Sequence, residues 1–278
     1  MTVLRHPPDA IYPEWMQPEP GPAAAPRISG TAMPGGVFMS IGSARTAGDL
    51  ALIGTGLSIA ILGSFGLALT YVVSWVVEQL SALPLTGMLL MAAPALDPGE
   101  APWLEIALNL LTLLSFLILM RITPLSGYHA AEHKVISAIE HFGDPTMERA
   151  RLMPRAHIRC GSNLLAGILP LLLVAQPLFV ISPIAAAVVV ILGWSFRYHT
   201  GYLIQQIFAT KEPTDRQLRA GLEAGRKILR LWRESGGRAV PPLVSFWRRG
   251  LVQMFVGMFL GITLLQHVYQ HLHVWLDF

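Results

Sequence analysis

The chain alternates between long apolar runs and short polar stretches, a pattern typical of helices that cross a lipid bilayer. Residues 50–77 carry no charge, residues 103–120 carry only Glu105, and residues 251–276 form a last apolar run. About 20 residues suffice for a spanning helix, so each run predicts one. Small residues that permit close helix packing recur in the first run, at Gly54, Gly56, Gly63 and Gly66.

A fourth apolar stretch, residues 164–196, is interrupted by three prolines, Pro170, Pro177 and Pro183. It is too long for one straight crossing and short for two. We predict a tight helical hairpin of two short legs that turns near residues 176–183.

The basic residues give the orientation of these spans. Of the 20 Lys and Arg residues, three precede the first run, six lie within residues 121–159 and eleven lie within residues 197–249. All lie on one side of the membrane if the hairpin returns to the side it left. Because basic loops stay cytoplasmic, we predict about five crossings, a cytoplasmic N-terminus and a C-terminus outside.

Composition agrees with this architecture. The chain is 53% hydrophobic and only 13% charged, whereas soluble domains carry about a quarter charged residues. We therefore predict an all-α integral membrane protein rather than a soluble enzyme. The spans are two single helices, the hairpin and a C-terminal helix, with cytoplasmic amphipathic helices between them, and the lipid bilayer is the first expected partner.

Two polar regions flank or separate the spans. Eight prolines in residues 7–35 favour an extended cytoplasmic arm over residues 1–49. Residues 214–235 predict an amphipathic surface helix whose outer side is mostly basic and touches anionic lipid. Its predicted apolar side is Leu218, Leu222, Ile228, Leu229 and Trp232. No nucleic-acid motif accompanies this helix, so no nucleic-acid partner is expected.

The stretch "HAAEH" places His129, Glu132 and His133 directly after the second span. Residues four apart share one face of a helix, so two imidazoles at this spacing can bind one metal ion. The glutamate between them can act as general base toward metal-bound water, as in the reversed form of the zincin motif. The alternative is a pair of interfacial histidines at a helix start that bind no metal.

A catalytic zinc needs a third protein ligand. The segment "HIRC" offers His157 or the single cysteine, Cys160, both suited to zinc. Glu140 shares the helical face of His129 but lies about 16 Å along the axis at 1.5 Å per residue, so it cannot easily share the ion. Glu212 is a further cytoplasmic carboxylate.

A separate cluster lies near the end of the last span. His267 and His271 share a helical face and could ligate a metal, a haem or a chlorin pigment. The alternative, interfacial histidines beside an aromatic belt, is the more common arrangement.

Three segments, "GYHAAEHKVISAIE", "HIRCGSNLL" and "QQIFATKEPTDRQLRAGLEA", occur in this order with apolar spans between them. In this respect the chain resembles the YqhQ-like family, bacterial membrane proteins of unknown function described as metal-dependent enzymes. The resemblance is best over residues 127–226. It implies a domain at residues 50–250, preceded by the arm and followed by an additional helix at 251–278.

The resemblance carries over a set of site residues by position: His129, Glu132, His133, Lys134, His157, Arg159, Cys160 and Glu212. It implies that His129 and His133 are metal ligands, that Glu132 is the base and that His157 or Cys160 completes the site. Arg159 would hold an anionic substrate group or a lipid phosphate.

The chain departs from the family pattern at several points. Ser40 stands where the family has an arginine, and Ile158 where it has a proline. The polar, strand-like segment expected before the first span is missing, and residues 251–276 lie beyond the family's expected extent. The ligands are intact, while part of their surroundings differs.

Two functions follow from the sequence. The first is a metal-dependent, zinc-type membrane enzyme of hydrolytic type, with its H-x-x-E-H site at the cytoplasmic surface of the bacterial inner membrane. The second is a non-catalytic accessory subunit of a respiratory or photosynthetic membrane complex. In that case the arm and the extra helix would make the contacts, and His267 or His271 would touch a haem or pigment.

Overall fold

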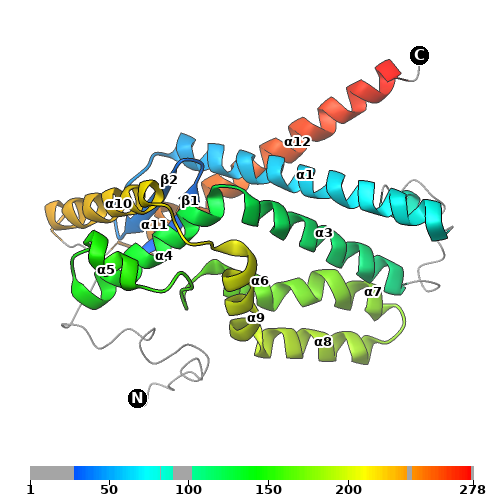
Figure 1. The fold of residues 1–278 in the computed structure, drawn as a ribbon, viewed down its shortest axis with the longest axis horizontal. Helices are drawn as coiled ribbons and strands as arrows, with labels where there is room; N and C mark the ends of the chain where they lie inside the picture. The colour runs from blue at the N-terminus through cyan, green and yellow to red at the C-terminus, as the bar shows by residue number, and fades with distance from the viewer. Residues whose placement is uncertain (1–27, 82, 90–101, 237–239, 277–278) are drawn as a thin grey trace. The chain divides into compact units, whose positions relative to one another are not determined.

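The computed structural model describes residues 28–81, 83–89, 102–236 and 240–276 (Figure 1). These residues form two compact units. The hairpin unit comprises the described parts of 65–122 and 156–209, and the sheet unit those of 28–64, 123–155 and 210–276. Residues 1–27 of the predicted arm lie outside the described residues.

The hairpin unit is entirely helical. Its elements are α1 (Asp49–Ser81) from residue 65 on, α2 (Leu85–Leu89), α3 (Pro102–Ile122), α6 (Gly161–Pro170), η3 (Leu171–Ala175), α7 (Gln176–Phe179), α8 (Pro183–Ser195), α9 (Arg197–Ile204) and η4 (Gln205–Ala209). The segment α6–α7 and the helix α8 form the two legs of a hairpin (Figure 1). Ser182 caps α8 by accepting a hydrogen bond from the Ala185 amide, so the chain turns within the predicted residues 176–183.

Within the described residues, four helices are long and apolar enough to cross a membrane: Asp49–Ser81, Pro102–Ile122, Gly161–Phe179 and Leu251–Val268. The second leg of the hairpin, Pro183–Ser195, is a shorter apolar helix. The prediction of a multi-pass, predominantly α-helical membrane protein is confirmed. The first leg is longer than predicted, because a π-helical segment carries the helix past Pro170.

The sheet unit begins with three strands that the sequence analysis did not predict. Strands β1 (Ser29–Met33), β2 (Gly36–Ile41) and β3 (Ala44–Arg45) form an antiparallel sheet in that order. Pro34 and Gly35 connect the first two strands, and Gly35 has φ 81°, as a type II turn requires. Residues 29–45 were predicted to belong to the extended arm; they are instead a folded part of this unit.

Helices α4 (Leu125–Phe142), α5 (Met147–Leu152) and α10 (Asp215–Glu234) complete the core of the sheet unit. Both α4 and α10 contact β2 and each other (Figure 1). Four of the five residues predicted for the apolar side of α10 are buried, and Trp232 packs against the core. Glycines on α10 bring the two helices close, since a Cβ at Gly225 would lie 2.7 Å from a methyl of Val135.

The remaining helices of the sheet unit are α11 (Pro242–Arg248) and α12 (Leu251–Leu276), and α12 packs closely on the first half of α1. A Cβ at Gly56 would overlap the carbonyl oxygen of Met254, and a Cβ at Gly257 would overlap that of Ile53. Further along, Gly261 faces Ala60. These contacts advance in the same direction along both helices, so α1 and α12 are parallel and begin at the same side.

A buried lysine holds α5 and the residues after it against α4. Lys134 is 5% exposed, and its Nζ donates to the carbonyl oxygens of Arg151 (3.2 Å) and Met153 (2.9 Å). It also pairs with Glu212 Oε1 at 2.9 Å. All three ammonium protons therefore have acceptors, as a buried lysine requires.

The segment before α10 holds the start of α4. Lys211 donates from its amide to Ser126 O at 3.2 Å and from Nζ to Thr123 O at 2.8 Å. Gln217 closes a capping box with Thr214 and donates to Pro124 O at 3.0 Å. Lys211 and Gln217, both in the motif "QQIFATKEPTDRQLRAGLEA", therefore hold the start of α4, which carries the motif "GYHAAEHKVISAIE".

We expect Gly56→Ala to destabilise the protein, because the added methyl would overlap the α12 backbone. Overpacking of this kind costs about 1–3 kcal/mol. Gly54→Ala is the matched control, since a Cβ there meets no described atom within 4 Å. Thermal unfolding in detergent should give a lower melting temperature for Gly56→Ala only. Equal melting temperatures for the two variants would contradict the close packing of α1 and α12.

We expect Lys134→Met to lower the free energy of unfolding by about 1–3 kcal/mol, because it leaves buried carbonyl oxygens without their donor. Glu212→Gln should cost less than about 1 kcal/mol, because the Glu212 side chain is 69% exposed and exposed ion pairs are weak. Denaturant titrations of both variants measure the difference. A loss for Glu212→Gln as large as that for Lys134→Met would argue against the carbonyl contacts as the main effect.

Candidate metal centre

Helix α4 carries the first motif through the core of the sheet unit. It follows Pro124 and ends at Gly143, whose left-handed conformation (φ 75°) lets its amide donate to Ile139 O. Glu132 and His133 are 5% and 2% exposed, whereas His129 is half-buried. Burial of polar groups on this scale requires partners for each of them.

The two histidines of the motif lie on one face of α4, as predicted. Their ring centroids are 4.4 Å apart. His133 Nδ1 lies 2.7 Å from the carbonyl oxygen of Arg155. Because a carbonyl oxygen only accepts, Nδ1 must carry the proton, and the lone pair of the neutral ring is then on Nε2. Most metal-binding histidines are oriented in this way, by a backbone carbonyl, a carboxylate or a water that accepts from the other ring nitrogen.

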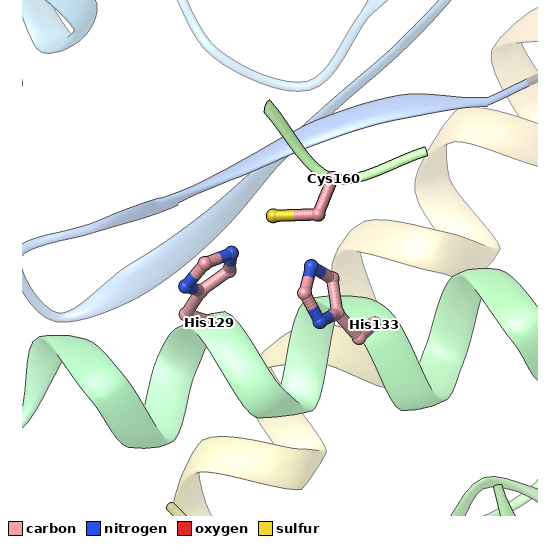
Figure 2. Close-up of side chains that lie close together, drawn as sticks. All are labelled: His129, His133 and Cys160. Atoms are coloured by element: carbon pink, nitrogen blue, oxygen red, sulfur yellow. The ribbon is translucent and has the colours of Figure 1, made fainter. Parts of the chain in front are cut away.

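His129 and His133 belong to a group of three residues that could hold a metal ion, and the third is Cys160 (Figure 2). Each residue offers one ligand atom, and these atoms lie within 4.8 Å of one another. His157, the other predicted third ligand, is not in this group.

The hydrogen bonds of the "HIRC" segment also distinguish His157 from Cys160. His157 Nδ1 accepts from the Arg159 amide at 3.3 Å, so its lone pair is directed to the backbone. Cys160 is the N-cap of α6, and its sulfur accepts from the Ser162 hydroxyl at 3.2 Å.

Buried amides that the sequence analysis did not single out support the same segment. Gln205 Oε1 accepts from the His157 amide at 2.7 Å, and Gln205 Nε2 donates to Asn163 Oδ1 at 3.3 Å. Asn163 in turn donates to Ile158 O at 2.6 Å. Asn163 lies inside the motif "HIRCGSNLL" and Gln205 inside "QQIFATKEPTDRQLRAGLEA". Their place in these motifs was the sequence signal that could have identified them.

Glu132 lies against β1. A Cβ at Gly30 would come within 2.6 Å of the Glu132 carboxylate, so only glycine leaves room for this side chain without a shift. Gly30 is therefore a further residue near the site that the sequence analysis missed, and no motif there indicated it.

The other predicted site residues lie as follows. Glu212 pairs with Lys134, and Glu140 is half-buried near the end of α4. Arg159 is exposed. His267 and His271 lie on α12 with ring centroids 4.3 Å apart, and both are exposed.

An ion pair joins α5 to the start of α10. Arg151 Nη2 lies 2.7 Å from Asp215 Oδ1. The hydrogen bond from this guanidinium holds the pKa of the Asp215 carboxyl below its usual value. Both groups are more than half exposed, so the pair contributes little to stability.

Comparison with known proteins agrees with the resemblance seen in the motifs. Residues 67–197, just under half of the chain, match the family described as "Protein of unknown function (DUF1385)". The uncharacterized protein YqhQ of Bacillus subtilis (strain 168) is 32% identical over 155 aligned positions, which cover 46% of this chain and 49% of that protein. The chain therefore spans about half the length of this curated relative.

No solved structure matches the chain. The matched range includes the first two motifs and therefore His129, Glu132, His133 and Cys160. The family match over residues 67–197 and the identity to YqhQ both support the resemblance of this chain to the YqhQ-like family.

Proposed function

We propose that this protein is a metal-dependent membrane enzyme of hydrolytic type, in which His129, His133 and Cys160 hold a zinc-type ion. The observation that carries the proposal is the grouping of three ligand atoms within 4.8 Å, with His133 oriented by a backbone carbonyl. Two imidazoles and one thiolate are a donor set suited to zinc. A bound ion of this type would supply Lewis-acid activation of a carbonyl, phosphoryl or water oxygen.

The chain's own residues take the remaining roles. Arg155 O and Ser162 Oγ orient His133 and Cys160, respectively, through the hydrogen bonds described above. Glu132 is placed to accept and return a proton, because its buried carboxylate sits between the two histidines in sequence and is confined by Gly30. The exposed Arg159 guanidinium would hold an anionic group of the substrate.

The site is proposed to face the cytoplasm, with the N-terminus on the same side and the C-terminus outside a bacterial inner membrane. The distribution of Lys and Arg residues supports this orientation. The parallel course of α1 and α12 also supports it, because both helices must then leave from one side.

A second candidate function rests on the paired rings of His267 and His271. Two exposed imidazoles 4.3 Å apart on one helix could contact a haem or pigment held by a neighbouring subunit. The protein would then be an accessory subunit of a larger membrane complex. Purification from native membranes separates the candidates, since this function requires fixed partners and spectroscopic absorption from the cofactor.

We expect purified protein to contain about one zinc-type ion per chain by elemental analysis. His133→Ala and Cys160→Ala should each lose it, because three protein ligands are needed for a catalytic site. Glu132→Gln should keep the ion, since this residue is not assigned as a ligand. His267→Ala is the control, with the same change at a histidine outside the group. A wild-type protein without stoichiometric transition metal would remove the basis of the proposal.

Alkylation of Cys160 gives an independent test, because it is the chain's single cysteine. We expect a maleimide probe to react slowly with the zinc-loaded protein and at least several-fold faster after treatment with a chelator, since a coordinated thiolate is shielded. His133→Ala should react fast in both conditions. A labelling rate that chelation does not change would exclude Cys160 as a ligand, even if metal is present.

A further inference from the structure

We propose that the sheet unit carries a binding surface for anionic lipid headgroups, formed by the outer face of α10 together with α11. This inference is independent of the proposed metal site. The surface is expected to bind the phosphate groups of anionic lipids. The charge and exposure of its side chains, and its position where α1 and α12 enter the membrane, support this.

The outer face of α10 is basic. Its exposed cations are Arg216, Arg219, Arg226, Lys227, Arg230 and Arg233, against the exposed acids Asp215, Glu223 and Glu234. Arg219, Arg226 and Arg230 are seven and four residues apart, so they share one stripe of the helix. None of these three forms an ion pair within the described part of the chain.

Helix α11 adds exposed apolar side chains to the same unit. Leu243, Phe246 and Trp247 are 81%, 49% and 50% exposed, and α12 begins only four residues after Trp247, at Leu251. At the start of α1, Leu50 is 84% exposed. Exposed Trp, Phe and Leu beside arginines are typical of segments that lie in the headgroup region.

Hydrogen bonds connect the basic helix to the membrane entry points. Lys227 Nζ donates to Thr46 O and Arg248 Nη1 donates to Ser43 O, each at 3.0 Å. The chain then reaches Asp49, the first residue of α1, which accepts from Gln253 Nε2 of α12 at 2.9 Å. One short segment therefore ties the middle of α10 to the starts of α1 and α12.

This placement favours lipid over a soluble polyanion. A nucleic acid or an acidic protein would be attracted by the arginines but would leave Leu243 and Trp247 in water. Headgroups match both features, because their phosphates meet the basic stripe while the adjoining acyl region accepts the apolar side chains. Each Lys or Arg near an anionic leaflet contributes about 1 kcal/mol, so a stripe of three can select anionic over zwitterionic lipid.

The test uses the full-length protein in nanodiscs made from a mixture of phosphatidylglycerol and phosphatidylcholine. The protein is extracted gently, and the ratio of the two lipids that remain bound is measured by mass spectrometry. We expect the wild type to retain phosphatidylglycerol at least about threefold over its share in the mixture, and this enrichment should fall as salt screens the charges.

The triple variant Arg219→Glu, Arg226→Glu, Arg230→Glu should lose most of this enrichment. Glu223→Lys, in the same stripe, should increase it and keeps the test decisive if the triple variant does not fold. Unchanged enrichment in both variants would overturn the proposal. Loss of the bound lipid on addition of inorganic phosphate at equal ionic strength would also overturn it, because the surface would then recognise free phosphate.

Discussion

A helix that buries Glu132, His133 and Lys134 in consecutive positions depends on a polar partner for each of them, because unpaired polar groups in a protein interior cost several kcal/mol. Lys134 and His133 find their acceptors on one short stretch of backbone, from Arg151 to Arg155. That stretch cannot move away without leaving both side chains unpaired. The orientation of the candidate metal ligand is therefore a consequence of how the buried lysine is satisfied.

Glycines make this enclosure sterically feasible. Gly127 leaves room for the Gln217 side chain, and Gly221 lets α10 approach the backbone of α4 at Ala131. In the hairpin unit, Gly66 of α1 faces the backbone of Phe116 in the same way. Close backbone approach brings the Gln217 side-chain amide within reach of Pro124 O at the start of α4, to which it donates at 3.0 Å. In this fold, small residues let the helices approach closely enough for polar side chains to reach their hydrogen-bond partners.

The spans, the hairpin turn and the buried face of α10 could be predicted because each depends on a local periodicity or on proline positions. The sheet could not be predicted from the same criteria, because prolines dominate the composition around it and β2 is buried almost throughout, without alternation. The turn at Pro34–Gly35 between two apolar runs was its local signal. The Lys134–Glu212 pair joins residues far apart in the chain, which no local pattern encodes.

The choice of third metal ligand, His157 or Cys160, likewise depends on the folded structure and could not be made from the motif. The sequence left His157 and Cys160 as equal candidates, since both are competent donors for zinc. The fold separates them, because His157 Nδ1 accepts from the Arg159 amide and has its lone pair engaged, whereas the ligand atom of Cys160 lies within 4.8 Å of those of His129 and His133. Donor chemistry can be read from residue types, but donor availability depends on hydrogen bonds that form only in the folded chain.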